Sequence, residues 1–161
     1  MTTLRKDRAT ERMERERAAL NLWDGLTGAS LVLRARLAEF LDAELGIQPE
    51  EADLLVRLGA APEQRLRMAD VSRSLHLSKS GVTRLVDRLA GRGLVVRAAC
   101  PSDRRVVYAG LTDDGRQAAA AAAPALAAGV AQQLAGRLSP DDLDLLTAAL
   151  RRIADSEEAG A

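Results

Sequence analysis

The chain contains very little of the chemistry that metal centres and most active sites require. Among its 161 residues there is one cysteine, Cys100, and one histidine, His76. A single cysteine excludes an intrachain disulfide and any zinc site built from several cysteines, and a single histidine removes most metal and catalytic-triad arrangements. We therefore expect no cofactor, no metal site and no enzymatic activity. The single cysteine also fits a protein of a reducing, intracellular compartment.

Aromatic residues and long apolar runs are also scarce. Trp23, Phe40 and Tyr108 are the only aromatic residues, so the core must be built from alanine, leucine and valine, a composition that favours closely packed helices. No stretch approaches the roughly 18 uninterrupted apolar residues that cross a bilayer, and the N-terminus alternates charges where a signal peptide has an apolar run. The length suits a single domain, and we expect a cytoplasmic protein without membrane association.

Positive charge is concentrated in one region of a chain that is neutral as a whole. The formal net charge is zero, yet residues 66–111 contain nine basic and three acidic side chains. Basic charge gathered on a small module is typical of nucleic-acid binding. The alternative is an ordinary solvated surface with a chance excess of arginine.

Hydrophobic spacing predicts helices in the first part of the chain. Residues 1–16 are mostly charged, with both signs mixed, which predicts a charged extension that is either a frayed tail or an exposed helix. From 18 to 45, apolar residues recur at spacings of three, four or seven, which predicts one long amphipathic helix, straight or bent. Pro49 then opens a shorter helix over 50–58, which Gly59 ends.

The middle of the chain predicts two short helices. We expect the first over 68–75 and the second from an N-capping Ser78 to about Ala90. Four apolar residues of the second helix recur at i, i+3, i+4 and i+7 and so share its buried face: Val82, Leu85, Val86 and Leu89.

The C-terminal part predicts two further helices. Thr112 caps a helix that continues through the alanine-rich run 118–128, because alanine is the strongest helix former, and that kinks near Pro124. Ser139 and Pro140 start the last helix. Its apolar stripe consists of Leu143, Leu146, Leu150 and Ile153.

Two helices joined by a short turn, with a polar exposed face on the second, predict a helix-turn-helix unit. The second helix has the width to enter a DNA major groove. Ser80, Thr83 and Arg84 lie on its outward, N-terminal part, where base-reading residues usually sit, and Lys79 and Arg88 at its flanks are expected to contact phosphates. The expected DNA contacts of this helix are Ser78, Lys79, Ser80, Thr83, Arg84 and Arg88. The alternative is an amphipathic helix with a solvated polar face.

A hairpin after this helix pair predicts a winged helix. The β-branched or apolar runs 94–99 and 106–111 predict two strands around a tight turn. Arg104 and Arg105 follow Asp103 at the turn, and arginine is the side chain that a narrow, electronegative minor groove attracts most. We therefore expect both arginines to contact DNA from the wing.

Carboxylates near the wing leave two alternatives open. In one, Asp103 pairs with Arg104 or Arg105 on a solvated turn. In the other, Asp87 or Asp103 holds one arginine in place while its neighbour reaches DNA. On the second alternative, Asp87 and Asp103 support the wing structurally.

With these elements in this order, the sequence resembles the MarR family of bacterial transcription regulators. The matching segments are LRMADVSRSLHLSKSGVTRLVDRLAGRGLVVR at 66–97, PSDRR at 101–105 and LTDDGR at 111–116. The resemblance covers about residues 20–155. It implies a mainly α-helical fold with a winged helix-turn-helix lobe, whose wing is a small β-hairpin, and with long N- and C-terminal helices that form a dimerisation region.

The resemblance also implies a domain organisation and a function. After the extension of residues 1–16, residues 17–161 form a single domain, in which 48–111 are the winged helix-turn-helix and 17–47 and 112–157 are the dimerisation helices. The implied function is that of a homodimeric, ligand-responsive repressor that binds a pseudo-palindromic operator in double-stranded DNA. The long apolar stripes support a dimer independently, because they exceed what one small lobe can cover.

Several further points stay open at the level of the sequence. The resemblance implies a small aromatic or phenolic effector, for which Trp23 is a candidate contact; a place in the core or the dimer interface is the alternative for this residue. Cys100 in the wing is interpreted as incidental, and His76 is either a phosphate contact or an ordinary turn residue. The alternative function is a protein–protein adaptor that uses a winged-helix scaffold without DNA.

Overall fold

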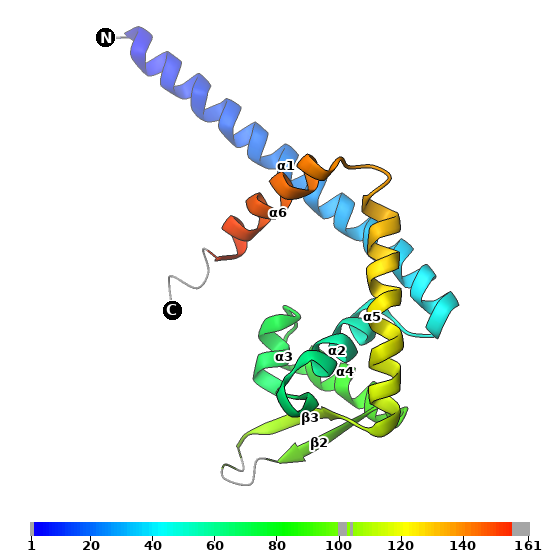
Figure 1. Cartoon of the computed structure of the whole chain (residues 1–161). Helices are drawn as coiled ribbons and strands as arrows, with labels where there is room; N and C mark the ends of the chain where they lie inside the picture. The colour runs from blue at the N-terminus through cyan, green and yellow to red at the C-terminus, as the bar shows by residue number, and fades with distance from the viewer. Residues whose placement is uncertain (1, 100–102, 104, 156–161) are drawn as a thin grey trace. The chain divides into compact units, whose positions relative to one another are not determined.

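The computed structural model describes residues 2–99, 103 and 105–155, and these are mostly helical (Figure 1). The helices are α1 (Thr2–Leu45), α2 (Pro49–Ala60), α3 (Met68–Ser74), α4 (Lys79–Gly91), α5 (Asp113–Leu134) and α6 (Pro140–Asp155). The strands are β1 (Arg65–Arg67), β2 (Val95–Ala99) and β3 (Val107–Leu111), and a short 3-10 helix, η1, spans Pro62–Gln64. The mainly α-helical fold with a hairpin wing is therefore confirmed.

Helix α1 joins the charged extension and the predicted long helix into one element. Of the two alternatives for residues 1–16, the structure has the helix, which begins at Thr2. Side chains from Thr10 to Arg36 are exposed, apart from Leu26 and Leu33, which are half-buried. Contacts divide the chain into two units after Arg36, and the predicted domain boundary after residue 16 stays a prediction.

Helix α2 begins as predicted but ends later. Pro49 occupies the first turn, whereas Gly59, predicted to end the helix, lies inside it. The helix ends at Ala60 because Pro62 disfavours helical backbone at the residue before it. That residue, Ala61, is extended, and its N–H donates to the Leu58 carbonyl at 3.2 Å.

The sheet has one strand more than the sequence predicts. The three strands are antiparallel in the order β1-β3-β2, with Arg65 opposite Gly110 and Val95 opposite Leu111. The predicted strands of the hairpin are confirmed as β2 and β3, while the turn residues 100–102 and 104 lie outside the described part of the chain. Strand β1 is missing from the prediction because three residues are too few to show a period of two.

A single aliphatic core holds α2, α4, α5 and the sheet together. The four predicted core residues of α4 are at most 1% exposed. They pack in one cluster with buried leucines of α2, and α5 lies alongside α2 (Figure 1). The buried side chains of these elements include Leu54, Leu55, Leu58, Val82, Leu85, Val86, Leu89, Val95 and Ala122.

The start of α5 is fixed against the beginning of the wing. Thr112 caps the helix as predicted, since its Oγ1 accepts a hydrogen bond from the Gly115 N–H at 2.9 Å and donates one to the Gly93 carbonyl at 2.7 Å. A β-carbon at Gly115 would lie 1.9 Å from the Leu94 carbonyl oxygen, so only glycine allows this approach. The alanine-rich run is helical as predicted, and α5 continues through Pro124.

Helix α6 is amphipathic, and its apolar stripe is largely uncovered. Its first turn is closed by Ser139 and Asp142: the Ser139 hydroxyl donates to the Asp142 carboxylate at 2.6 Å, and the Asp142 N–H donates to the Ser139 Oγ at 3.2 Å. Of the predicted stripe, Leu146, Leu150 and Ile153 are exposed, by 41 to 56%. An apolar helix face in water indicates that something else covers it.

Candidate nucleic-acid interface

The turn between α3 and α4 is set by local hydrogen bonds and one unusual backbone conformation. The Ser72 hydroxyl donates to the Leu77 carbonyl at 2.6 Å, and His76 adopts a left-handed conformation with φ of 51°. Ser78 then caps α4, its Oγ accepting from the Gly81 N–H at 3.1 Å. His76 is therefore a turn residue in this fold, and the predicted cap is confirmed.

The exposed face of α4 carries most of the residues predicted to contact DNA. Because the opposite face is fully buried, the helix can present its polar side chains in one direction only. Lys79 and Arg84 form no ion pair or hydrogen bond with any residue that the structure describes, so their charges are available. The exposed members of the predicted set on this helix are Lys79, Ser80, Thr83, Arg84 and Arg88, and Ser78 just before it is also exposed.

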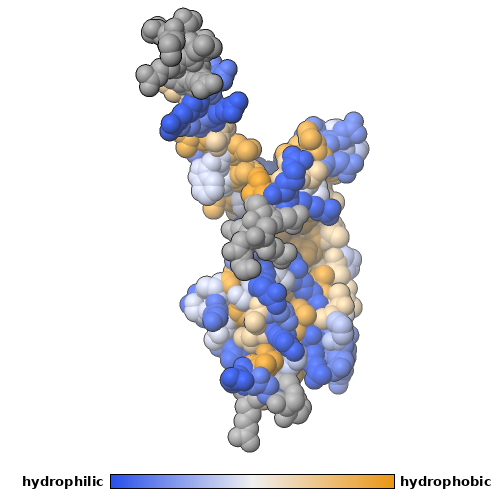
Figure 2. Space-filling view, turned by 90° about the vertical axis from the view of Figure 1, so that its left-hand side faces the viewer, coloured by the Kyte–Doolittle hydropathy of each residue, from blue (hydrophilic) through white to orange (hydrophobic). Residues whose placement is uncertain are grey.

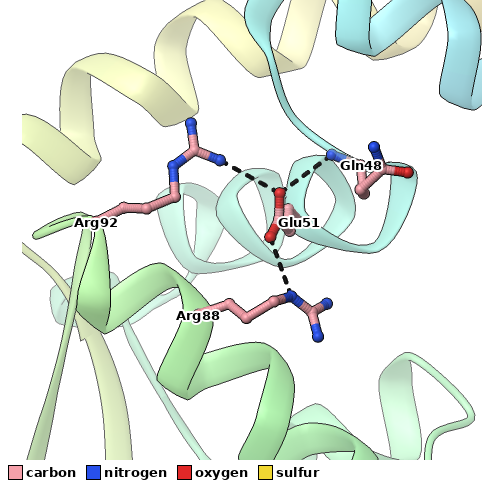
Figure 3. A network of polar contacts seen from close by, with 4 residues as sticks. All are labelled: Gln48, Glu51, Arg88 and Arg92. Carbon is pink, nitrogen blue, oxygen red and sulfur yellow. Dashed lines mark hydrogen bonds and ion pairs between the residues drawn. The ribbon is translucent and has the colours of Figure 1, made fainter.

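Arg88 differs from its neighbours because it contacts a buried carboxylate (Figure 3). Its Nε donates to Glu51 Oε1 at 3.3 Å, and Arg92 Nη1 donates to Glu51 Oε2 at 3.3 Å. The backbone N–H of Gln48 donates to the same Oε2 at 3.1 Å. The Glu51 side chain is 6% exposed, so these three donors compensate a charge that has lost its hydration.

Glu51 is a residue that the sequence analysis missed. On α2, the buried residues Leu54, Leu55 and Leu58 lie three, four and seven positions after Glu51. Glu51 therefore lies on the same, buried face of the helix. An acidic residue within an apolar stripe is the signal that could have identified it, because buried carboxylates are almost always paired.

The wing is braced against α4 through Arg97 of β2. Arg97 Nη2 lies 2.6 Å from Asp87 Oδ1 and 3.1 Å from the carbonyl oxygen of Thr83, to which it donates. Asp87, predicted to support the wing, thus contacts the wing's first strand, whereas the prediction named the arginines at its tip. The role of Asp87 in DNA binding stays a prediction.

At the tip of the wing, Asp103 and Arg105 are paired. Asp103 Oδ1 accepts from the backbone N–H of Arg105 at 3.0 Å and from its Nε at 3.4 Å. The Arg105 side chain is nevertheless 92% exposed, so its terminal nitrogens face solvent. Arg104 lies outside the described residues, and so does Cys100.

A hollow of about 450 Å³ lies between the start of α4 and the wing. Its described lining contains four cationic side chains and no carboxylate; these are Arg67, Lys79, Arg97 and Arg105. The remaining lining comes from Met68, Ala69, Val82, Thr83, Val106 and Val107. A concave surface with charge of one sign raises the local potential for an anionic partner.

Arg67 of this lining and its neighbour Arg65 contact an aromatic ring at the edge of the sheet. Arg65 and Arg67 of β1 lie over the Tyr108 ring, with guanidinium carbons 5.0 and 6.0 Å from its centroid. Arg67 Nε also donates to the Tyr108 hydroxyl at 3.3 Å. These contacts fix cations beside the hollow, and the sequence analysis missed them because it did not predict β1.

Trp23, the candidate effector contact, is 67% exposed on α1. The alternative interpretation of Trp23 as a core residue is therefore wrong within a single chain. Within the described residues no group of three or more His, Cys, Asp or Glu side chains is arranged to hold a metal ion. None of the described helices has the length and apolar character that spanning a membrane requires.

Comparison with known proteins gives a consistent picture. A family model described as the MarR family matches residues 45–106. The chain is 35% identical over 109 residues to an uncharacterised HTH-type transcriptional regulator, YkoM of Bacillus subtilis, covering 68% of this chain and 69% of YkoM. It is 30% identical over 80 residues to the HTH-type transcriptional repressor MdtR of the same species, covering 43% of this chain and 52% of MdtR.

Among solved structures, the chain resembles Sco3205, a MarR family transcriptional regulator from Streptomyces coelicolor crystallised in complex with DNA. The TM-score is 0.78 at 31% identity, covering 85% of this chain and 86% of Sco3205. Members of this family are DNA-binding regulators of transcription, which confirms the expectation of a regulator and not an enzyme. The order of elements, the cationic face of α4 and these similarities agree: the chain belongs to the MarR family of winged-helix transcriptional regulators.

Proposed function

We propose that the protein is a homodimeric, sequence-specific regulator in which α4 reads the major groove and the wing reaches the adjacent minor groove. The observation that carries the proposal is the exposed face of α4, where Lys79 and Arg84 have no partner in the described chain and the opposite face is buried. The cationic hollow extends this surface toward the wing. DNA presents closely spaced phosphates and base-edge acceptors to such a surface.

The side chains divide into three roles in this proposal. Ser80, Thr83 and Arg84 contact base edges, since they occupy the exposed N-terminal half of α4. Lys79 and Arg88 contact phosphates at the two ends of this row, with Ser78 beside the first. In the wing, Arg104 and Arg105 enter the minor groove, and Asp103 and Asp87 hold the wing in place.

The partner for the uncovered apolar surface is a second copy of the chain. On α6, Leu145, Leu146, Leu150 and Ile153 are exposed, and an apolar hollow of about 530 Å³ is lined by α5, Val56 and Leu143. On α1, hydrophobic patches alternate with hydrophilic ones along the surface (Figure 2). The exposed large hydrophobic residues of this helix are Met13, Leu20, Leu22, Trp23, Leu31 and Val32. Helices with this composition are expected at an isologous interface, where the same patch occurs on both subunits.

Within this function, the protein represses transcription, and a small effector relieves the repression. Similarity to the repressor MdtR supports repression. The resemblance to the MarR family supports a small aromatic or phenolic effector. Because Trp23 is exposed on a helix that we assign to the dimer interface, we place it there, or beside an effector bound next to that interface. We expect the regulator to act in the cytoplasm, where the chromosome is accessible.

Selection of bound fragments from random and genomic DNA tests this function. We expect a pseudo-palindromic site with half-sites about one helical turn apart, since twofold-related subunits meet successive major grooves on one side of the duplex. With about six phosphate contacts, the logarithm of the binding constant should fall with the logarithm of salt concentration with a slope of about −5. A shallow salt dependence, together with a tight protein partner, would instead support the adaptor function.

A further inference from the structure

The geometry of the Glu51 network gives Arg88 a constrained orientation. Arg88 contacts Glu51 through Nε alone, at 3.3 Å, and within the described chain neither of its terminal nitrogens has a partner. Figure 3 shows these two nitrogens directed away from Glu51, and the side chain is 54% exposed. Arg92 differs, because it uses a terminal nitrogen, Nη1, for its contact.

The position of Arg88 on α4 explains why this orientation matters. Ser80, Arg84 and Arg88 are spaced by four residues and therefore form one ridge along the helix surface. Arg84 lies in the exposed middle of this ridge, and Arg88 lies one turn further along. A guanidinium at that place, with two free terminal nitrogens, has the donors for a phosphate oxygen at the end of the reading face.

We propose that Glu51 is a positioning residue for DNA binding, which orients Arg88 so that its two terminal nitrogens meet a phosphate. This inference rests on the proposed function of α4. A free arginine loses rotamer freedom when it binds a phosphate, and an arginine already held at Nε loses less. Glu51 itself is fixed by burial and by the Gln48 N–H, so it can act as a rigid support.

A purely structural salt bridge makes a different prediction. If Glu51 and Arg88 served only to attach α4 to α2, replacement of Arg88 would lower stability and leave the salt dependence of DNA binding unchanged. Arg92 supplies the matched control, because it contacts the same carboxylate from a position just beyond the end of α4.

The experiment measures binding of the full-length chain to its selected duplex over a series of salt concentrations. For Arg88→Ala we expect the magnitude of the salt slope to decrease by about 1.8, because a twofold-symmetric dimer loses one phosphate contact, worth about 0.9, in each subunit, whereas Arg92→Ala should leave the slope unchanged. Arg88→Lys keeps the charge but provides only one ammonium group for two partners, Glu51 and the phosphate. We expect this variant to bind DNA more weakly than wild type, whereas a role for charge alone predicts equal binding.

Coupling between the two residues tests the positioning role itself. Glu51→Gln keeps the size of the side chain and the hydrogen bond to the Gln48 N–H, and should weaken DNA binding by a factor of about three to ten. In the Arg88→Ala background the same substitution should change the affinity by less than about twofold, because its effect acts through Arg88. Circular dichroism and thermal melting establish that each variant is folded, and the two Arg88 variants test the role even if Glu51→Gln does not fold.

The outcomes separate this inference from the proposed function. A wild-type chain that binds no duplex overturns the proposed function. A wild-type chain that binds with a steep salt slope, while Arg88→Ala keeps that slope, overturns the role of Glu51 and Arg88 alone. Equal effects of Glu51→Gln in the presence and absence of Arg88 also overturn it.

Discussion

The winged-helix lobe and helix α6 bury their apolar residues to very different extents. In the lobe, α4 buries four aliphatic side chains almost completely and shows solvent a polar, cationic face. In α6, Leu145 is 67% exposed and Ile153 56% exposed, on a helix that is equally amphipathic. The lobe therefore buries its apolar residues within one chain, whereas the apolar face of α6 stays exposed in a single chain.

This difference shows that amphipathic helices of one chain can expose outward faces of opposite chemistry. The outward face of α4 includes two cations, Lys79 and Arg84, that have no partner among the described residues and that suit an anionic polymer. The outward face of α6 has leucines, which suit another apolar surface. The same helical periodicity thus gives a polar, cationic outward face in one region and an apolar outward face in the other.

Two leucine substitutions, one in each region, should differ most in their effect on stability. Leu85→Ala in the lobe should lower the free energy of unfolding by about 2–5 kcal/mol, because it leaves a cavity in a closed core. Leu145→Ala in α6 should change it by less than about 0.5 kcal/mol in dilute, monomeric protein. Urea denaturation at low protein concentration measures both, and equal losses would contradict the distinction between the two regions.

Introducing a charge on the apolar face of α6 should separate the subunits. We expect Leu150→Asp to convert the proposed dimer into a monomer with a folded lobe and to weaken operator binding on the order of 10²-fold, because both half-sites are then no longer held by one assembly. Light scattering gives the mass, and Arg151→Gln, at an exposed neighbouring position, is the control. A dimer that survives Leu150→Asp would assign this face to another partner.

Arginines of the lobe should differ in what they contribute to DNA recognition. Arg84→Ala should weaken binding by about 1–3 kcal/mol and relax sequence preference, since it removes the contact to a base edge that we propose for Arg84. Arg105→Ala should weaken binding more uniformly across sequences, because the minor-groove contact that we propose for Arg105 depends on groove shape. Gel-shift titrations on operator and shuffled duplexes measure both, with Arg57→Ala, an α2 surface residue paired with Asp53 at 2.8 Å, as the control without effect.

The smallest effect is expected at the start of α6, from pH. The Ser139 hydroxyl, followed by the Ser139 N–H, donates to Asp142 and lowers the pKa of that carboxyl below 3.8. A lowered pKa in the folded state means that the cap stabilises α6 above pH 3.8 and that this contribution is lost as the pH falls through the folded pKa.

Thermal melts of the wild type and of Asp142→Asn check this sign. The difference in melting temperature between the two proteins should be present at neutral pH and should shrink as the pH falls below 3.8. A difference that grows on acidification would contradict the capping role. Because the group is fully exposed, the effect should be small beside those of the substitutions above.

Local features of the sequence were sufficient for most of the fold. Ser78 and Thr112 cap their helices as predicted, and the spacing of Val82, Leu85 and Leu89 fixes the buried face of α4. Capping and helical periodicity depend on residues within about one or two turns, so they can be read from one stretch of chain. The predicted end of α2 at Leu58 is wrong, because the prediction takes Gly59 as the residue that ends the helix. The helix continues to Ala60, and Pro62 sets its boundary.

Periodicity along the chain is enough to predict that a cationic face lies opposite an apolar one on α4, and that a hairpin follows this helix. Which cations form ion pairs depends on packing: Arg88 contacts Glu51, 37 residues away, and Arg97 of β2 contacts Asp87 of α4. Packing also decides that Arg84 is left without a partner in the described chain. The physical reason is that an ion pair depends on the distance between side chains brought together by packing, and spacing along the chain does not record that distance.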